Sequence, residues 1–247
     1  MTKVYSHPQA KAEIILVHGL NGNPRKTWTS GTPPNDVYWP TDLLPTSLQN
    51  DYANILVYGY NADVFTTASW PFFGRKDGDK DKDGHHDQYG TPKASSPSDN
   101  DIRQHAQSLV ATLTAFRKSQ RTERLPLIWV AHSLGGILTK AALLYSSSVR
   151  TSHQEELRGI FVSTYAIIFL GTPHLGSDAA ALGLIIQRMI DSLAPRKWFD
   201  SESVLLKTLK KDSETLRAIN DQFLEIYQKF RIHMVHENHK TDVKGTK

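Results

Sequence analysis

The residues with the clearest chemical potential surround Ser133, in the stretch Ala-His-Ser-Leu-Gly-Gly at residues 131–136. A serine hydroxyl serves as a nucleophile when a base takes its proton and a sharp strand-to-helix turn, the nucleophile elbow, lifts it to the edge of a sheet. Ala131 and Gly135 are small enough to permit that turn. The same residues also suit an ordinary turn, so this stretch by itself leaves both interpretations open.

A second stretch, His18-Gly19-Leu20, follows an apolar run near the start of the chain. Negative charge develops on the carbonyl oxygen during acyl transfer, and backbone N–H groups that point at this oxygen stabilise it. One donor comes from the residue after the nucleophile, here Leu134, and another from a loop after an early strand. We therefore expect the Leu20 and Leu134 N–H groups to form an oxyanion hole, with His18 holding the loop by hydrogen bonding. In the alternative interpretation, the stretch is only a turn.

A third stretch, Leu-Gly-Thr-Pro-His-Leu-Gly-Ser at residues 170–177, also follows an apolar run. We expect His174 to order the loop after its strand, and the alternative is that this side chain lines the substrate pocket. A fourth stretch, Tyr-Gly-Tyr-Asn-Ala at residues 58–62, ends another apolar run. All four stretches thus lie where a predicted strand ends, which is where ligands bind in open α/β sheets.

Taken in order, these stretches resemble one lipase/esterase-like family. It includes the serine-active-site-containing proteins and the N-terminal hydrolase domains of fungal NLR-like (NACHT) proteins. The resemblance covers residues 12–240, and the chain is also similar, more distantly, to the inositol deacylases that trim GPI anchors. Further matching pieces are Thr27-Trp28-Thr29, the Trp-Pro-x-Asp-Leu-Leu-Pro run at residues 39–45, and Asp212, Ser213, Asn220 and Phe223.

The resemblance implies a Ser–acid–His triad in that chain order, with Ser133 as the nucleophile. The acid of the family follows the penultimate strand, and Glu237 occupies that place. A carboxylate there would orient the imidazole and stabilise its charged form. Four other acidic residues remain alternatives for this role: Asp178, Asp191, Asp200 and Asp242.

The histidine of the triad is the part of this pattern that we do not find. The family places it after one more strand, in an Asp-His pair, whereas the sequence ends at Lys247. We therefore expect an α/β-hydrolase fold that lacks its last strand and helix, and with them its general base. His239 lies beyond Glu237, but too close to it in sequence for the usual loop geometry. Among the other histidines, we expect His132 to point into the sheet or the helix packing.

The leading functional hypothesis is an esterase- or lipase-type serine hydrolase that acts on a small-molecule or lipid ester through a Ser133 acyl-enzyme. The alternative is a catalytically impaired domain that serves as a signalling or interaction module of an NLR-like protein, with a protein partner or further domains. Peripheral contact with a mitochondrial or endoplasmic-reticulum membrane is a third hypothesis, because some relatives act on phospholipids. None of these hypotheses calls for a cofactor or a metal.

The elements that must position these residues follow from the apolar pattern. Five short runs rich in Val, Ile, Leu and aromatic residues predict buried strands. Between them, apolar residues three and four positions apart predict helices. This alternation indicates a three-layer α/β fold with a mostly parallel sheet, built as a single domain over residues 1–247. The predicted strands are 12–17, 54–58, 127–131, 166–170 and 230–235, and the predicted helices are 102–116, 137–145, 182–193 and 209–230.

Residues 73–98 do not fit this alternation, because they are rich in Gly, Asp, Lys, Pro and Ser. Their composition predicts a long exposed insertion, and loops of that length are usually functional lids or disordered segments. Residues 79–84 resemble the start of a calcium-binding loop, but its twelfth position is Gly90 instead of the required Glu. We therefore expect a solvated charged loop here and no metal site.

Composition excludes several other classes of protein. The chain has no cysteine, which rules out disulfides, thiolate metal sites and cysteine nucleophiles, and which fits a reducing compartment. Its 29 basic and 25 acidic residues give a net charge of +4 without a basic stripe, so we expect no nucleic-acid partner. No apolar run is long enough to cross a bilayer or to form the core of a secretory signal near the N-terminus. We therefore expect a cytoplasmic protein, or one at the surface of a membrane.

Overall fold

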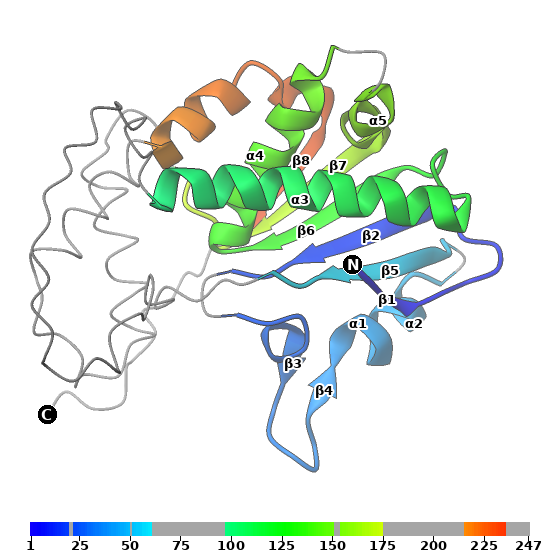
Figure 1. Ribbon diagram of the computed structural model, residues 1–247. Helices are drawn as coiled ribbons and strands as arrows, with labels where there is room; N and C mark the ends of the chain where they lie inside the picture. The colour runs from blue at the N-terminus through cyan, green and yellow to red at the C-terminus, as the bar shows by residue number, and fades with distance from the viewer. Residues whose placement is uncertain (20–21, 50, 61–96, 151–153, 175–214, 236–247) are drawn as a thin grey trace, which may run out of the picture.

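A six-stranded, mostly parallel sheet forms the centre of the molecule (Figure 1). The computed structural model describes residues 1–19, 22–49, 51–60, 97–150, 154–174 and 215–235. The strands of the sheet are β1 (Thr2–Tyr5), β2 (Ala12–Val17), β5 (Ala53–Tyr58), β6 (Leu127–His132), β7 (Thr164–Leu170) and β8 (Arg231–Val235). Their order is β1-β5-β2-β6-β7-β8. β1 pairs antiparallel with β5, and all other neighbours in this sheet run parallel.

The five predicted strands are confirmed as β2, β5, β6, β7 and β8. Successive residues of β2 face opposite sides of the sheet: Ile15 and Val17 pack into one core, and Ile14 and Leu16 into the other. A strand that is covered on both faces has no polar face, which explains the continuous apolar runs in the sequence. β1 was not predicted, because this edge strand is only partly buried and carries mixed side chains.

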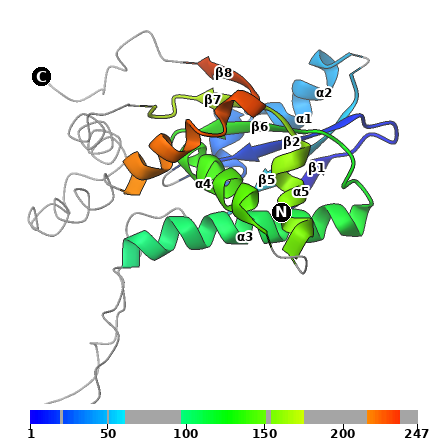
Figure 2. The ribbon, with the colours of Figure 1, turned by 90° about the horizontal axis from the view of Figure 1, so that it is seen from above.

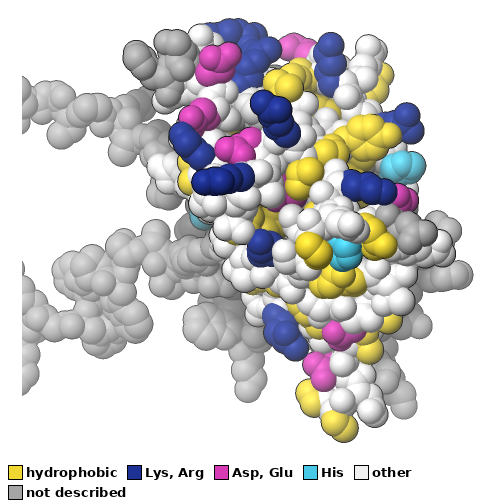
Figure 3. All heavy atoms as spheres, turned by 90° about the vertical axis from the view of Figure 1, so that its right-hand side faces the viewer, with side chains coloured by type: hydrophobic (Ala, Val, Ile, Leu, Met, Phe, Trp, Pro, Cys, Tyr) yellow, Lys and Arg dark blue, Asp and Glu magenta, His cyan; other side chains and the backbone are white. Residues whose placement is uncertain are grey.

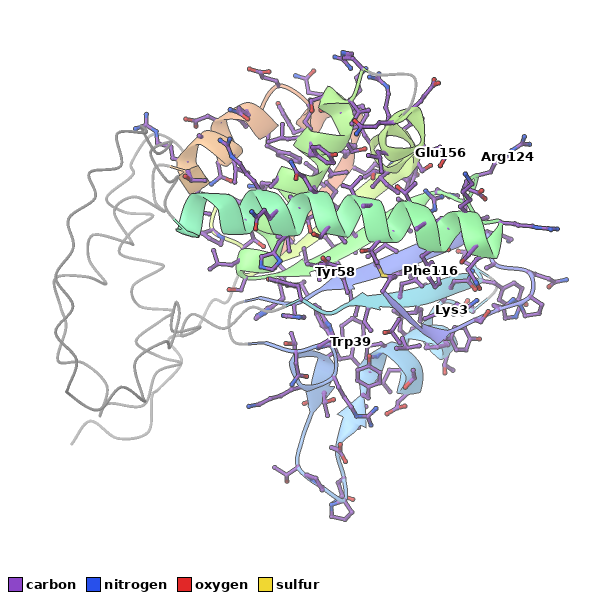
Figure 4. The ribbon with its side chains drawn as sticks, in the orientation of Figure 1. Lys3, Trp39, Tyr58, Phe116, Arg124 and Glu156 are labelled. Atoms are coloured by element: carbon purple, nitrogen blue, oxygen red, sulfur yellow. The ribbon has the colours of Figure 1, made fainter. Side chains whose placement is uncertain are left out.

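Three helices cover one face of the sheet, as Figure 2 shows from above. They are α3 (Pro97–Gln120), α4 (Leu134–Ser148) and α5 (Glu155–Ser163). Helical residues 215–223 pack on the same face. Their apolar side chains and those of the strands form one buried cluster, which includes Leu109, Leu113, Trp129 and Ile137. In Figure 4, Tyr58 and Phe116 lie on this side of the sheet and Trp39 lies on the opposite side.

The opposite face is covered by shorter elements from the first quarter of the chain. These are η1 (Lys26–Trp28), β3 (Thr29–Ser30), β4 (Val37–Tyr38), α1 (Trp39–Asp42) and α2 (Leu44–Ser47). Trp28 and Tyr38 pack there against the side of β2 that carries Ile14 and Leu16. The rings of Trp39 and Trp28 make an edge contact. The molecule therefore has three layers, as predicted.

The helical predictions need two corrections. The predicted helix 209–230 ends earlier in the described region: helical residues stop at 223, and the 3-10 helix η3 (Tyr227–Lys229) leads into β8. Phe230, directly before β8, is buried and has an extended backbone with φ −120° and ψ 152°. α3 begins at Pro97, inside the segment predicted as an insertion, because proline suits the first turn of a helix. Residues 73–96 and the predicted helix 182–193 lie outside the described residues.

The end of the molecule where α3 finishes carries mixed surface charge. Figure 3 shows this end, where cationic and anionic side chains are interspersed with small apolar groups. Lys118 on α3 pairs there with Glu156 on α5 at 2.6 Å. Within the described residues, no helix is long and apolar enough to cross a membrane.

Candidate active site

Ser133 occupies a sharp turn between β6 and α4, at the carboxyl end of the parallel strands. Its backbone has φ 55° and ψ −130°, a sparsely populated positive-φ conformation that costs a non-glycine residue about 1–3 kcal/mol. The Ser133 N–H donates to the carbonyl of Leu170 at the end of β7, at 2.9 Å, which fixes the turn to the neighbouring strand. This strained strand–turn–helix is the geometry of a nucleophile elbow, and with the mostly parallel sheet it gives the chain an α/β-hydrolase fold.

The loop after β2 lies directly against the elbow. A Cβ atom added to Gly19 would lie 2.7 Å from the Ser133 Cβ and 3.1 Å from its Oγ, so only a glycine permits this approach. Gly135 packs against the end of β2 and the start of the same loop, because a Cβ there would collide with the carbonyl oxygens of Val17 and His18. The fold thus brings together two stretches that the sequence separates by more than a hundred residues.

A buried histidine and a tyrosine hold this loop. His18 is fully buried, and its Nδ1 lies 3.0 Å from the Gly19 carbonyl, which only accepts, so Nδ1 carries the proton. The Tyr60 hydroxyl donates to the His18 carbonyl at 2.9 Å, and the two rings stack at 4.5 Å. Burial lowers the pKa of His18, although the bond to Gly19 opposes that shift, so the imidazole is neutral at pH 7.

His132 departs from the prediction that it points into the sheet or the helix packing. Its side chain is exposed, and its ring meets the edge of Trp28 at 6.3 Å on the face opposite α4. The reason is the alternation along β6: Ala131 faces the core under α4, so the next residue points the other way.

The loop after β7 is attached to α4 through a buried cation. The Lys140 Nζ lies 2.9 Å from the Nδ1 of His174 and donates to the Oδ1 of Asn220 at 2.5 Å. The same Nζ faces the rings of Phe169 and Phe223 at 5.3 and 5.4 Å. Desolvation lowers the pKa of Lys140 to about 8, because its side chain is 4% exposed.

The predicted site residues are only partly within the described region. Ser133, His18, Gly19, Gly135 and the half-buried Leu134, the first residue of α4, lie together at one end of the sheet. Backbone N–H groups in the first turn of a helix have no acceptor within that helix, so the Leu134 N–H has no acceptor within α4. The other predicted oxyanion donor, Leu20, lies outside the described residues, as do Glu237 and His239.

Three residues at this end of the sheet received no role from the sequence: Tyr60, Lys140 and Asn220. Lys140 does carry a signal, because it is a single cation in the apolar run 137–144 that follows the elbow. Tyr60 and Asn220 belong to stretches that the family resemblance includes, but their polar atoms gain meaning only from the partners that the fold supplies. Among the described residues, no group of three or more His, Asp or Glu side chains could hold a metal ion.

Known proteins share this sequence pattern. Protein SERAC1 of Mus musculus is 27% identical over 235 residues, which cover 89% of this chain and 30% of that protein. Protein SERAC1 of Homo sapiens is 26% identical with the same coverage, so the chain spans about 30% of the length of these relatives. The lipase BlEst2 of Bacillus licheniformis, in its mature form, matches with a TM-score of 0.38 and 19% identity over 89% of this chain and 66% of that one. The model of the family described as "Putative serine esterase (DUF676)" matches residues 8–243, and the chain belongs to this family.

Proposed function

We propose that the protein is an esterase- or lipase-type hydrolase that cleaves a carboxylic ester through an acyl-enzyme on Ser133. The observation that carries this proposal is the positive φ of Ser133 at the strand–helix turn, with the backbone of Gly19 packed against its side chain. A strained residue persists only where its surroundings enforce it, and such residues gather at functional sites. Membership of a serine esterase family supports the same reaction.

The proposed reaction has two steps. The Ser133 Oγ attacks the ester carbonyl carbon while a base takes the hydroxyl proton, and the tetrahedral oxyanion accepts from the N–H groups of Leu134 and Leu20. Its collapse breaks the ester C–O bond, and the alcohol leaves with the proton. Water then attacks the acyl-enzyme by the same route, which releases the acid and restores Ser133.

The acid–base part of the proposal assigns the triad carboxylate to Glu237. In this role it would orient the imidazole of a histidine and stabilise the charged form of that ring. His239 is the first histidine to replace when the base is sought. A site without one triad member keeps residual catalysis of about 10³–10⁴-fold over water from its oxyanion hole and binding, so each replacement stays measurable.

The substrate in this proposal is a small-molecule or lipid ester. A series of p-nitrophenyl esters of increasing acyl length distinguishes these classes, because an apolar acyl pocket gains affinity with each buried methylene. Flotation with anionic liposomes tests the separate proposal that the protein works at a membrane surface, which needs co-flotation that weakens as salt is raised.

Labelling with a fluorophosphonate probe tests the proposed nucleophile. We expect the wild-type chain and the matched control Ser148→Ala to be labelled, and Ser133→Ala to remain unlabelled. Equal labelling of Ser133→Ala would contradict the proposal. A folded wild-type chain that is never labelled, but assembles with a partner independently of Ser133, would instead support the interaction-module alternative.

A further inference from the structure

The side chains of Lys140, His174 and Asn220 form a cluster that takes no part in the two proposed chemical steps. The cluster nevertheless lies near the segments that hold Ser133. Lys140 stands seven residues after Ser133 on α4, about 10 Å along the helix axis. His174 stands four residues after Leu170, whose carbonyl accepts from the Ser133 N–H. The cluster therefore joins the two segments that meet at the elbow.

The segment 171–174 is held to α4 at two points. Thr172 is buried against the first turn of α4, where a Cβ added to Gly136 would lie 2.8 Å from the Thr172 Cβ. One helical turn later, Lys140 contacts His174. The first residue of the segment, Gly171, has φ +56° and donates its N–H to the Val235 carbonyl of β8 at 2.9 Å. It directly follows Leu170, whose carbonyl accepts from the Ser133 N–H, so a shift of residues 172–174 would strain this junction and disturb the carbonyl that holds the elbow.

The donors and acceptors of the cluster fix the direction of its hydrogen bonds, and Lys140 is the donor in both. An ammonium group has three donors and no acceptor, so the Nδ1 of His174 accepts and the imidazole proton resides on Nε2. Helical residues 215–223 contribute Asn220, and the neighbouring Asp221 pairs at the surface with Arg217 at 3.5 Å. Among the described residues, His174 is thus the one titratable group that faces the Lys140 ammonium, and no carboxylate balances it.

A charge buried without a carboxylate costs stability, and an apolar side chain of similar volume would fit this apolar helix at lower cost. Methionine has nearly the length of lysine without its charge. A lysine kept at such a position is explained more directly by its two polar contacts than by packing.

We propose that Lys140 is a positioning residue of the serine site. By donating to His174 and Asn220 it fixes segment 171–174 across the first turns of α4, and thereby fixes the Leu170 carbonyl and the orientation of Ser133. This inference rests on the proposed function, because its consequence is the reactivity of Ser133. Lys140 itself does not touch the reacting atoms.

The first test compares fluorophosphonate labelling rates of the full chain and Lys140→Met. We expect labelling of Ser133 to slow about tenfold or more, because small displacements of reacting groups cost large factors in rate, while the melting temperature stays equal or rises. Lys118→Met, an exposed lysine on α3, is the matched control and should label like the wild type.

The second test keeps Lys140 and changes its surroundings with Asn220→Asp. Loss of the proton from Lys140, whose pKa is about 8, removes one of its three donors and its charge, so both contacts weaken and we expect wild-type labelling to slow at alkaline pH. A carboxylate near the ammonium favours the charged form, so this fall in labelling rate should begin at least about one pH unit higher in Asn220→Asp than in the wild type. This variant tests the inference even where Lys140→Met does not fold.

The outcomes separate the two proposals. A wild-type chain that is not labelled overturns the proposed function and the positioning role with it. Wild-type labelling that Lys140→Met leaves unchanged, or an alkaline limb that Asn220→Asp does not move, overturns the positioning role alone. Slower labelling in a stably folded Lys140→Met, together with a shifted limb in Asn220→Asp, supports it.

Discussion

Two buried cations lie at opposite ends of the sheet, and their surroundings differ. At the amino end, Arg117 pairs with the buried Glu13 through Nε and Oε2 at 2.8 Å, and both side chains are almost inaccessible. Its guanidinium also donates to the carbonyls of Thr122, Glu123 and Leu125, which closes the turn after α3. At the carboxyl end, Lys140 has an imidazole, an amide and two aromatic faces, with no carboxylate among the described residues.

This difference separates a structural cluster from a functional one. Arg117 faces a carboxylate, is multiply bonded and lies at the other end of the sheet from the elbow, so its environment serves the connection between α3 and β6. Burial lowers the pKa of Lys140 to about 8, so its charge costs folding stability. In our proposal, the same side chain holds the loop beside Ser133 in place. Four predictions test this contrast, in order of decreasing effect.

Removing Arg117 should have the largest effect on stability. Arg117→Ala leaves Glu13 buried and unpaired, and we expect the free energy of unfolding to fall by about 3–5 kcal/mol in urea denaturation. The double variant Glu13→Leu/Arg117→Met, which removes both charges, should lose less than the single one. The comparison fails if Arg117→Ala is as stable as the wild type.

The charge of Arg117 is expected to stabilise the fold, whereas the buried charge of Lys140 is expected to destabilise it. The pH dependence of stability should show this difference. Its folded pKa of about 8 lies below the ordinary 10.5, so the unfolded chain binds more protons between these values and wild-type stability rises with pH in this window. Relative to Lys140→Met, the wild type should gain about 3 kcal/mol by pH 10.5. If the free energies of unfolding of the two proteins changed in parallel across this pH range, that result would contradict a lowered pKa of Lys140 in the folded protein.

Adding one methyl group next to the nucleophile should affect the reaction more than the fold. Gly19→Ala places a Cβ 2.7 Å from that of Ser133, so one of the two segments must move. We expect kcat/KM to fall about 100-fold, as for displacements of about 1 Å near a reacting group. Gly159→Ala, whose added Cβ meets no atom within 4 Å, is the matched control and should stay active.

Removing the Tyr60 hydroxyl should have the smallest effect of the four. Tyr60→Phe keeps the ring stacked on His18 but leaves the His18 carbonyl without this donor, which costs about 1–3 kcal/mol. Part of this loss should appear as a roughly tenfold lower kcat/KM, because the carbonyl belongs to the loop that we propose supplies an oxyanion donor. An unchanged kcat/KM would show that the tyrosine supports the fold alone.

The sequence predicted the frame of this site well because buried parallel strands have a clear signature. The apolar runs 12–17 and 127–131 predicted the strands that lead into the loop after β2 and into the elbow, and the small residues Ala131 and Gly135 indicated the tight turn at Ser133. The helix after Ser133 followed from the same apolar pattern. These features depend on local composition, which a single sequence contains.

The polar partners of the site could not be predicted in the same way. Lys140 and Asn220 are eighty residues apart and meet only because helical residues 215–223 pack beside α4. His132 was misplaced because a one-residue difference in strand phase reverses the face of a side chain. The end of the helix at residue 223 was also missed, because Phe230 keeps the apolar spacing of the helix but is buried just before β8 by tertiary packing.

Trapping the acyl-enzyme tests the central claim most directly. The wild-type chain is mixed with a p-nitrophenyl ester, quenched in acid and digested, and the peptides are measured by mass spectrometry. We predict a burst of p-nitrophenolate and one acyl group on the peptide that contains Ser133, with neither in Ser133→Ala. An acyl group on another residue, or ester hydrolysis that persists in Ser133→Ala, would contradict the assignment of Ser133 as the nucleophile.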